Sequence, residues 1–506
     1  MPRELQIDTA PGRRYGRRLL ATMSLTASTH SHFADGTVQL WGFDFGSTTC
    51  SAAAATARLA KSAVSGRVLL QDLAVQYCSP ITLTPRCGDL LDLAAIDQLL
   101  QQWLTAGKFQ PQQIFGGGTL ITGLAARSVN VAELRSLLTS RIGPGLIATA
   151  AEPCLESWVA FMAGCADLSR QHPGSYFLNL DIGGGTANLA LGHRGSVLST
   201  GALLVGARHL QVHPGSYQLT AISEPGAFLL SQLGIPKQAG DTLTESEVRA
   251  VLAFQVRILE ACISGNRDYF LPPQLRYFQE VPLAIPAEVR DLIPTYTGGV
   301  GELIYRILRG EPLPSQTAFG DLGIELAQAI VCSPTLLPPQ ARTLVPTQQS
   351  RATLYGMMQH GTEVSGTTLY LPNPQLLPLY DLPILGKICV AEADDRLDAL
   401  LRLALLSPAG ACIQIDSTCA TLEQVRHLAS QLQAALLRCH FPSSLPLVLL
   451  LAKNVGKLLG SYITRWGQLP LKLVAVDEIS DRNMAFVSLG ALRNQVLPIS
   501  LYGMNR

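Results

Sequence analysis

The sequence predicts an α/β protein made of two lobes of similar design followed by a further α/β region. Two observations carry this prediction. First, a block of strand, Asp-x-Gly turn with small and hydroxyl residues, returning strand and third strand occurs twice, around Asp44 and Asp181. The two aspartates are too far apart for a short repeat unit, so each block belongs to a domain of its own. Second, strand-like and helix-like runs alternate from Ile384 onward, which is typical of α/β units.

The composition is that of a large globular protein without a strong charge bias. The chain has 506 residues, 47% of them apolar and 15% charged, with a net charge of +1. A chain of this length forms several domains. The balanced charge disfavours nucleic-acid partners, and no apolar run approaches the roughly 20 residues of a membrane-spanning helix. The 11 cysteines include no C-x-x-C pair, so we expect free thiols rather than a zinc site or a disulfide framework.

Shifts in composition divide the chain into four parts. An arginine cluster and a polar stretch in residues 1–38 predict a disordered or irregular N-terminal extension. We expect the first lobe over residues 39–150, the second over 151–370, and the C-terminal α/β region over 371–506. Within this last region, residues 371–385 are rich in proline and leucine and predict a linker or an irregular arm.

The expected elements follow the hydrophobic patterns along the chain. Residues 38–43 predict a strand that ends at Asp44, and residues 176–180 predict its counterpart, ending at Asp181. The other expected strands are residues 50–55, 67–71, 113–122 (interrupted by three consecutive glycines), 187–191, 196–200, 413–415 and 447–451, and the expected helices are residues 91–104, 244–265, 321–331 and 422–438.

Two segments, residues 44–49 and 181–186, carry the residue types that bind nucleotide phosphates together with Mg²⁺. Glycine lets backbone N–H groups approach phosphate oxygens, and an aspartate can stand near the metal, often through the water that Mg²⁺ retains. Either segment alone also fits a simple hairpin turn, but two such loops in facing domains can clamp one nucleotide. The candidate phosphate ligands are Gly46, Ser47, Thr48, Thr49, Gly183, Gly184, Gly185 and Thr186, and the candidate catalytic and Mg²⁺-binding carboxylates are Asp44 and Asp181.

A third segment, residues 296–302, has the sequence Tyr-Thr-Gly-Gly-Val-Gly-Glu. Glycines here let a base or ribose lie close to the backbone. Gly298, Gly299 and Gly301 are therefore candidate adenosine contacts. A glycine turn before a helix that begins near Gly301 is the alternative interpretation of this segment.

These three segments, in this order, resemble the signature of the actin-like ATPases, a superfamily that includes sugar kinases and the seventy-kilodalton heat-shock chaperones. The resemblance implies two actin-like (ribonuclease H-like) lobes around a nucleotide cleft. It also implies a first connecting helix at residues 148–157, where Glu152 and Glu156 are candidates for orienting an attacking water. The alternative is that both are ordinary carboxylates at the start of a helix.

Longer stretches resemble the reactivating factors of ethanolamine ammonia-lyase, the EutA family, over roughly residues 39–500. The stretches that carry this resemblance are residues 179–188, 319–323, 351–369, 456–460 and 476–478. The sequence departs from the family at Leu124, where the family has a glutamate, at 357–359, where Met-Met-Gln replaces small residues, and at 483–485. These departures concern the rate of hydrolysis and the closure of the lobes.

The resemblance implies ATP hydrolysis with Mg²⁺, coupled to release of damaged cobalamin from ethanolamine ammonia-lyase so that intact adenosylcobalamin can rebind. It implies a cytoplasmic location and leaves association with a bacterial microcompartment open. The alternatives that stay open are a reactivase of diol or glycerol dehydratase, a small-molecule kinase, an actin-like filament protein, and a nucleotide-binding scaffold that has lost turnover.

Overall fold

The computed structural model describes residues 36–61, 68–88, 90–143, 153–365, 368–481, 483–493 and 495–504. The expected N-terminal extension lies outside these residues except for its last few positions, and so does Glu152. No helix in the described ranges combines the length and the apolar character that crossing a membrane requires.

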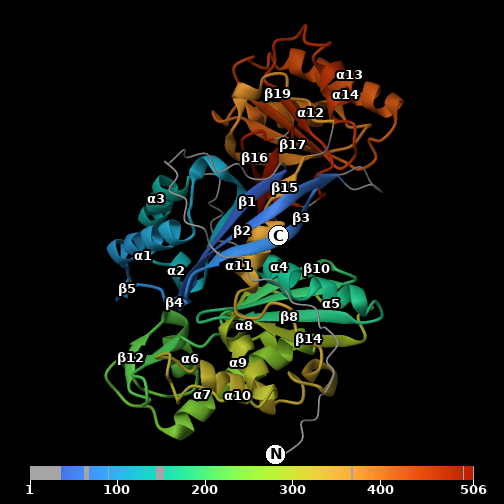
Figure 1. The fold of residues 1–506 in the computed structure, drawn as a ribbon. Helices are drawn as coiled ribbons and strands as arrows, with labels where there is room; N and C mark the ends of the chain where they lie inside the picture. The colour runs from blue at the N-terminus through green and yellow to red at the C-terminus, as the bar shows by residue number, and fades with distance from the viewer. Residues whose placement is uncertain are drawn as a thin grey trace, which may run out of the picture. The chain divides into compact units, whose positions relative to one another are not determined.

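The first sheet has β1 at its centre, next to β2 and β7, in the order β3-β2-β1-β7 (Figure 1). Its strands are β1 (Thr37–Phe45), β2 (Thr49–Lys61), β3 (Val68–Cys78), β4 (Thr82–Leu83), which pairs with β2, and β7 (Ile114–Ile121), and the nearby elements are β5 (Arg86–Cys87), β6 (Leu90–Leu91), α1 (Leu93–Ala106), α2 (Gly123–Ala126) and α3 (Val131–Ile142). β1 runs antiparallel to β2 and parallel to β7. Side chains alternate between the two faces of a strand, so Trp41 and Phe43 pack against α1 and α3 while Asp44 points to the opposite face.

The three glycines of β7 do not interrupt the strand, contrary to the expectation from sequence. They are instead required by close packing. Gly117 has a φ of +124°, and a Cβ there would lie 1.8 Å from the carbonyl oxygen of Trp41. A Cβ at Gly118 would lie 2.1 Å from the terminal methyl group of Met357. The bulk of Met357, which departs from the family pattern, is therefore accommodated by a glycine on the strand that faces it.

The second sheet repeats the topology of the first. In the order β13-β10-β9-β8-β14, β8 runs antiparallel to β9 and parallel to β14, as β1 does to β2 and β7. The elements here are β8 (Tyr176–Ile182), β9 (Ala187–His193), β10 (Ser196–Leu203), β11 (Leu210–Val212), β12 (Leu219–Ile222), β13 (Gln279–Val281), β14 (Leu292–Thr297), α4 (Pro153–Gly164), α5 (Ala166–Gln171), α6 (Glu224–Gln232), α7 (Glu245–Ile263), α8 (Pro273–Arg276), α9 (Gly298–Leu308) and α10 (Gly323–Cys332). The prediction of two lobes of similar design is confirmed.

Two helices connect the lobes. α4 packs on β8, β9 and β10, whereas α11 (Ala352–His360) packs on β1, β2 and β7, and the two helices contact each other (Figure 1). They cross closely at Gly356, where a Cβ would lie only 2.2 Å from the carbonyl oxygen of Val159. The absence of a side chain at Gly356 is therefore a condition for this crossing.

The C-terminal region forms a third sheet, in the order β15-β21-β20-β16-β17-β18-β19. Its elements are β15 (Glu363–Val364), β16 (Leu379–Ile388), β17 (Ala411–Ile415), β18 (Leu447–Leu451), β19 (Leu473–Val476), β20 (Met484–Leu489), β21 (Pro498–Met504), α12 (Asp394–Ala404), α13 (Leu422–Arg438) and α14 (Gly456–Ile463). The expected linker at 371–385 is wrong in its second half, which forms the central strand β16. Pro383 is tolerated there because the ladders on both sides of it shift register nearby.

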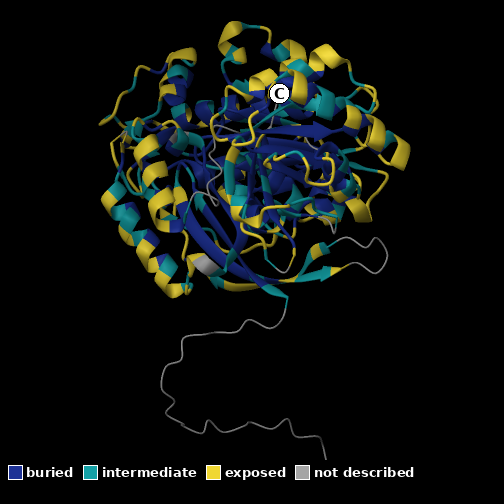
Figure 2. Ribbon diagram, turned by 90° about the horizontal axis from the view of Figure 1, so that it is seen from above, coloured by how far each residue is buried: buried dark blue, intermediate teal, exposed yellow. Residues whose placement is uncertain are grey.

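Burial follows the three sheets. In Figure 2 the strands are mostly dark blue, while exposed residues are concentrated on helices and loops. The largest apolar core lies on the second sheet and includes Phe161, Phe177 and Tyr296. The site residues described next stand at the ends of buried strands, where neighbouring elements fix their positions.

Candidate functional site

The loop after β1 is held by hydrogen bonds of its own backbone and by Thr84. The Gly46 N–H donates to the Thr49 carbonyl at 2.9 Å. The Thr84 N–H donates to the Thr48 carbonyl at 2.9 Å, and the Thr84 hydroxyl donates to the Gly46 carbonyl at 2.8 Å. Since the carbonyls of Gly46, Thr48 and Thr49 are already used, the loop can offer a ligand its remaining N–H groups and the Thr48 hydroxyl, which is buried without a hydrogen-bond partner.

The loop after β8 is anchored in the same way. The Gly183 N–H donates to the Thr186 carbonyl at 3.0 Å, closing the turn. From the segment after β10, the N–H groups of Ala207 and Arg208 donate to the carbonyls of Gly183 and Gly184 at 3.1 Å and 2.6 Å. Both loops are thus tight turns that orient their N–H groups independently of any ligand.

The two loops lie against each other. A Cβ at Gly184 would lie 1.9 Å from the Thr48 hydroxyl oxygen. Gly123 follows β7 and has a φ of +54°. A Cβ there would lie 2.1 Å from the Ser47 hydroxyl oxygen and 3.7 Å from the Thr186 hydroxyl oxygen. The structure therefore brings the two predicted phosphate segments together, and glycine at 123 and 184 is what allows them to approach.

Asp44 and Asp181 occupy equivalent positions at the ends of β1 and β8. The Thr353 hydroxyl of α11 donates to Asp44 Oδ2 at 2.9 Å, and the Thr297 hydroxyl donates to Asp181 Oδ1 at 2.7 Å. The other oxygen of Asp44, Oδ1, is buried and has no hydrogen-bond partner. An orphaned buried carboxylate oxygen is costly, and a bound cation or its water would satisfy it.

Electrostatics at these two carboxylates also favours a cation. Burial raises the pKa of Asp44 to about 6, against a smaller lowering by the Thr353 hydroxyl. Burial raises the pKa of Asp181 to about 7, the Thr297 hydroxyl lowers it, and the charge of Asp44 raises it further. Within the described ranges, no group of three or more His, Cys, Asp or Glu side chains is arranged to hold a metal. Two carboxylates and a few hydroxyls suit Mg²⁺, which keeps much of its water, better than a metal that needs a full protein cage.

Glu156, in the first turn of α4, is the third carboxylate at this position. Burial and the charges of Asp181 and Asp44 hold its pKa well above the usual range, although hydrogen bonds with Asn188 and Thr122 lower it. It faces a cavity of about 160 Å³. The residues lining this cavity are Gly123, Ala126, Arg127, Pro153, Glu156, Thr186, Asn188 and Glu280. A carboxyl group with a raised pKa beside a chamber that can hold water is suited to accept a proton.

The three glycines of the third segment have different surroundings. α9 begins at Gly298, three residues earlier than expected, with Thr297 as its N-cap. Gly298 has a φ of +79°, and a Cβ there would lie 2.6 Å from the Ile182 carbonyl oxygen. Gly301 is buried, and its Cβ would lie 2.8 Å from the backbone of Tyr296, whereas Gly299 is exposed with open space around it. The small size of Gly298 and Gly301 is thus already explained by the packing of the protein itself.

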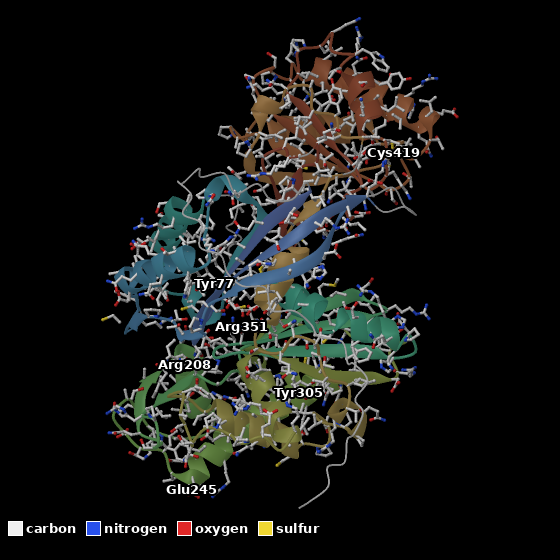
Figure 3. All side chains as sticks on the ribbon, in the orientation of Figure 1. Tyr77, Arg208, Glu245, Tyr305, Arg351 and Cys419 are labelled. Atoms are coloured by element: carbon white, nitrogen blue, oxygen red, sulfur yellow. The ribbon has the colours of Figure 1, made fainter. Side chains whose placement is uncertain are left out.

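Several residues at the site were not singled out from sequence. Thr353 and Thr297 come from α11 and the end of β14, so only the fold brings them to the two aspartates. Arg208, labelled in Figure 3, packs against the second loop, since a Cβ at Gly184 would lie 3.1 Å from the Arg208 Cβ. Its buried Nε has no hydrogen-bond partner, and its Nη1 lies 4.0 Å from Asp321 Oδ2. A lone threonine or arginine gives no signal in a sequence, although the stretch containing Asp321 was recognised as resembling the family.

Several solved structures share a distant likeness with this chain. A Ppx/GppA enzyme of Aquifex aeolicus is 14% identical, with a TM-score of 0.33 over 56% of this chain and 75% of its own. An exopolyphosphatase of Cytophaga hutchinsonii is 13% identical, with a TM-score of 0.34 over 63% and 97%. The ethanolamine utilization protein EutJ of Carboxydothermus hydrogenoformans is 12% identical, with a TM-score of 0.26 over 63% and 89%. Likeness at this level adds nothing to the topology described above.

Sequence comparison is far more specific. Two proteins called ethanolamine ammonia-lyase reactivase EutA, from Salmonella typhimurium and Escherichia coli, are each 29% identical over 481 residues. Each match covers 91% of this chain and 97% of the relative. The family described as ethanolamine utilisation protein EutA matches residues 37–504, which include all three sheets and both aspartate loops. With its two lobes of the same sheet topology and its C-terminal α/β region, this chain belongs to the EutA family.

Proposed function

We propose that this protein is an ATP-dependent reactivase of ethanolamine ammonia-lyase, which releases damaged cobalamin so that intact adenosylcobalamin can rebind. Membership of the EutA family, together with relatives named as reactivases of this lyase, supports the choice of partner. The observation that carries the nucleotide part is the meeting of the two aspartate loops at Thr48 and Gly184. Loops that approach this closely can share one phosphate chain.

In this proposal Asp44 and Asp181 hold a hydrated Mg²⁺, which neutralises charge on the phosphates. The orphaned Oδ1 of Asp44 and the raised pKa values of both carboxylates support this assignment. The phosphate ligands are the hydroxyl and N–H groups of 46–49 and 183–186. Gly298, Gly299 and Gly301 are the proposed adenosine contacts, with Gly299 the most open of the three.

Glu156 is the proposed residue that orients and deprotonates the attacking water. It lines the 160 Å³ cavity together with Thr186 of the second loop, so water held there would stand beside the phosphate-binding groups. Hydrolysis would be phosphoryl transfer driven by positioning and by charge neutralisation. The lack of the family glutamate at Leu124 then matters less, because a carboxylate from α4 already faces the chamber.

Coupling to the lyase requires the ATP and ADP forms to differ in their affinity for it. Both connecting helices begin at the site. Thr353, in the first turn of α11, donates a hydrogen bond to Asp44. Glu156 lies in the first turn of α4, and the charges of both aspartates raise its pKa. Loss of the terminal phosphate would change the contacts at the start of both helices together, which is a physical route from hydrolysis to lobe movement.

The experiment that tests the proposal is the recovery of ethanolamine ammonia-lyase inactivated with bound cyanocobalamin. We expect activity to return when this protein, Mg²⁺, ATP and fresh adenosylcobalamin are added, and not when ATP is omitted. Free phosphate should appear without any small-molecule acceptor, which a kinase would need. Absence of recovery with competent lyase would contradict the proposal, and recovery of an inactivated diol dehydratase instead would move the partner to that enzyme.

The raised carboxylate pKa values lead to a prediction for pH. The usual pKa of an aspartate is 3.8, and burial raises those of Asp44 and Asp181 to about 6 and about 7. Between pH 3.8 and about 7, Asp44 and Asp181 of the metal-free folded protein bind protons that the unfolded chain has already released. The two carboxyl groups therefore lower the free energy of unfolding of the metal-free protein as the pH rises through this range. Mg²⁺ must displace the protons. We therefore expect Mg²⁺-nucleotide affinity to weaken as the pH falls from about 7.5 to about 5.5.

Titration calorimetry at about pH 6 in two buffers of different ionisation enthalpy measures this proton release directly. Asp181→Asn should reduce the number of protons released. The same heat in both buffers, with an affinity that does not change with pH, would exclude these carboxylates as the metal ligands.

A further inference from the structure

One ion pair joins the two lobes across the cavity beside Glu156. Arg127, which follows α2 in the first lobe, has Nη2 2.5 Å from Oε1 of Glu280 in β13 of the second lobe. The two side chains retain 42% and 25% of their exposure. Both residues line the 160 Å³ cavity, so the pair lies at its wall rather than elsewhere on the surface.

Acidic side chains outnumber basic ones in the described lining of this cavity. Its described lining holds two carboxylates, from Glu156 and Glu280, and a single cation, from Arg127. Thr186, a candidate phosphate ligand, lines the same cavity. A terminal phosphate held by the second loop would therefore lie close to Arg127 and would compete with Glu280 for its guanidinium group.

The competition favours the phosphate. An ion pair between half-exposed side chains is weak, because water screens it and both side chains lose freedom in forming it. A guanidinium group can bind a phosphate through two parallel, charge-assisted hydrogen bonds, whereas the structure shows one such contact, from Nη2 to Oε1, between Arg127 and Glu280. A terminal phosphate also carries more negative charge than a carboxylate.

We propose that Arg127 is the γ-phosphate sensor of the site, paired with Glu280 when ADP or no nucleotide is bound and transferred to the terminal phosphate when ATP is bound. This inference rests on the proposed function. It assigns to Glu280 the role of a competitor for Arg127, which adds a link between the two lobes when no terminal phosphate is bound. The nucleotide state thereby decides whether this link between the lobes exists.

The test compares the affinities of the full-length protein for ADP and for a non-hydrolysable ATP analogue, both with Mg²⁺, by displacement of a fluorescent nucleotide. Arg127→Gln should weaken binding of the ATP analogue by about tenfold or more, with ADP binding changed less than about twofold, because only ATP carries the phosphate that the arginine binds. Glu280→Gln should strengthen binding of the ATP analogue several-fold and leave ADP unchanged, since it removes the competitor.

Arg141→Gln is the matched control. Arg141 pairs with Asp97 at 2.7 Å in the first lobe, with side-chain exposures of 42% and 24%, nearly those of the Arg127 pair. The Arg141→Gln variant should change neither the affinity for ADP nor the affinity for the ATP analogue. Equal changes for both nucleotides, or none, in the Arg127 and Glu280 variants would overturn the inference while leaving the proposed function intact. A wild-type protein that binds neither nucleotide would refute both.

Discussion

Replacing Asp181 with alanine should lower ATP turnover at least about a hundredfold, because it removes a carboxylate that would hold Mg²⁺ against the phosphates. Asp181 ends β8, is buried, and keeps its position through the Thr297 hydroxyl. Release of free phosphate under saturating Mg²⁺-ATP is the measurement. Turnover near that of the wild type would remove Asp181 from the site.

The same variant should remain folded. Burial raises the pKa of Asp181, because desolvation disfavours its charged form. Removing this carboxylate is therefore not expected to lower the free energy of unfolding of the metal-free protein. A thermal melt without Mg²⁺ checks this. Asp291→Ala is the control for turnover. Asp291 lies in the same lobe, but it is on the surface and accepts a hydrogen bond of 2.7 Å from the Ser175 hydroxyl. The Asp291→Ala variant should leave phosphate release unchanged.

Replacing Gly356 with alanine should destabilise the protein by about 1–3 kcal/mol. The new methyl group would lie 2.2 Å from the carbonyl oxygen of Val159, which is backbone and cannot turn away. Alanine gains up to about 1 kcal/mol over glycine inside a helix, but the overlap outweighs this gain. Chemical denaturation measures the change in the free energy of unfolding.

Gly174→Ala provides the comparison. Gly174 is exposed between α5 and β8, and a Cβ there would meet no atom within 4 Å. Its variant should have nearly the stability of the wild type. If Gly356→Ala were equally stable, the close crossing of α4 and α11 would be wrong as described.

Much of the fold could be predicted because it follows from local patterns. α13 and β18 have the predicted bounds, since each is a long periodic or continuous apolar run with clear ends. The repeat of two lobes was visible because the same strand-turn-strand pattern surrounds Asp44 and Asp181. β16 was missed because prolines and leucines in 371–385 indicate irregular chain locally, whereas pairing with β17 and β20 decides the matter.

The candidate site could be predicted from the sequence only where its residues are adjacent in the chain. The two aspartate loops are short motifs, and the structure brings them together. What could not be predicted are contacts between distant segments, such as Thr353 with Asp44 or Arg127 with Glu280. The role of Gly123 was hidden for the same reason, since its need for a positive φ beside Ser47 appears only in three dimensions.

Because α11 packs closely on α4 at Gly356, any tilt of α11 would turn about its contact with Val159. One arm of α11 runs back to Thr353, about 4.5 Å along the helix axis, and the other runs forward to His360, about 6 Å away. β15 follows the far end directly and pairs with β21 of the C-terminal sheet. Under the proposed function, a tilt of α11 imposed at Asp44 would therefore move its His360 end slightly further than its Thr353 end, and β15 would pass this movement to the C-terminal sheet.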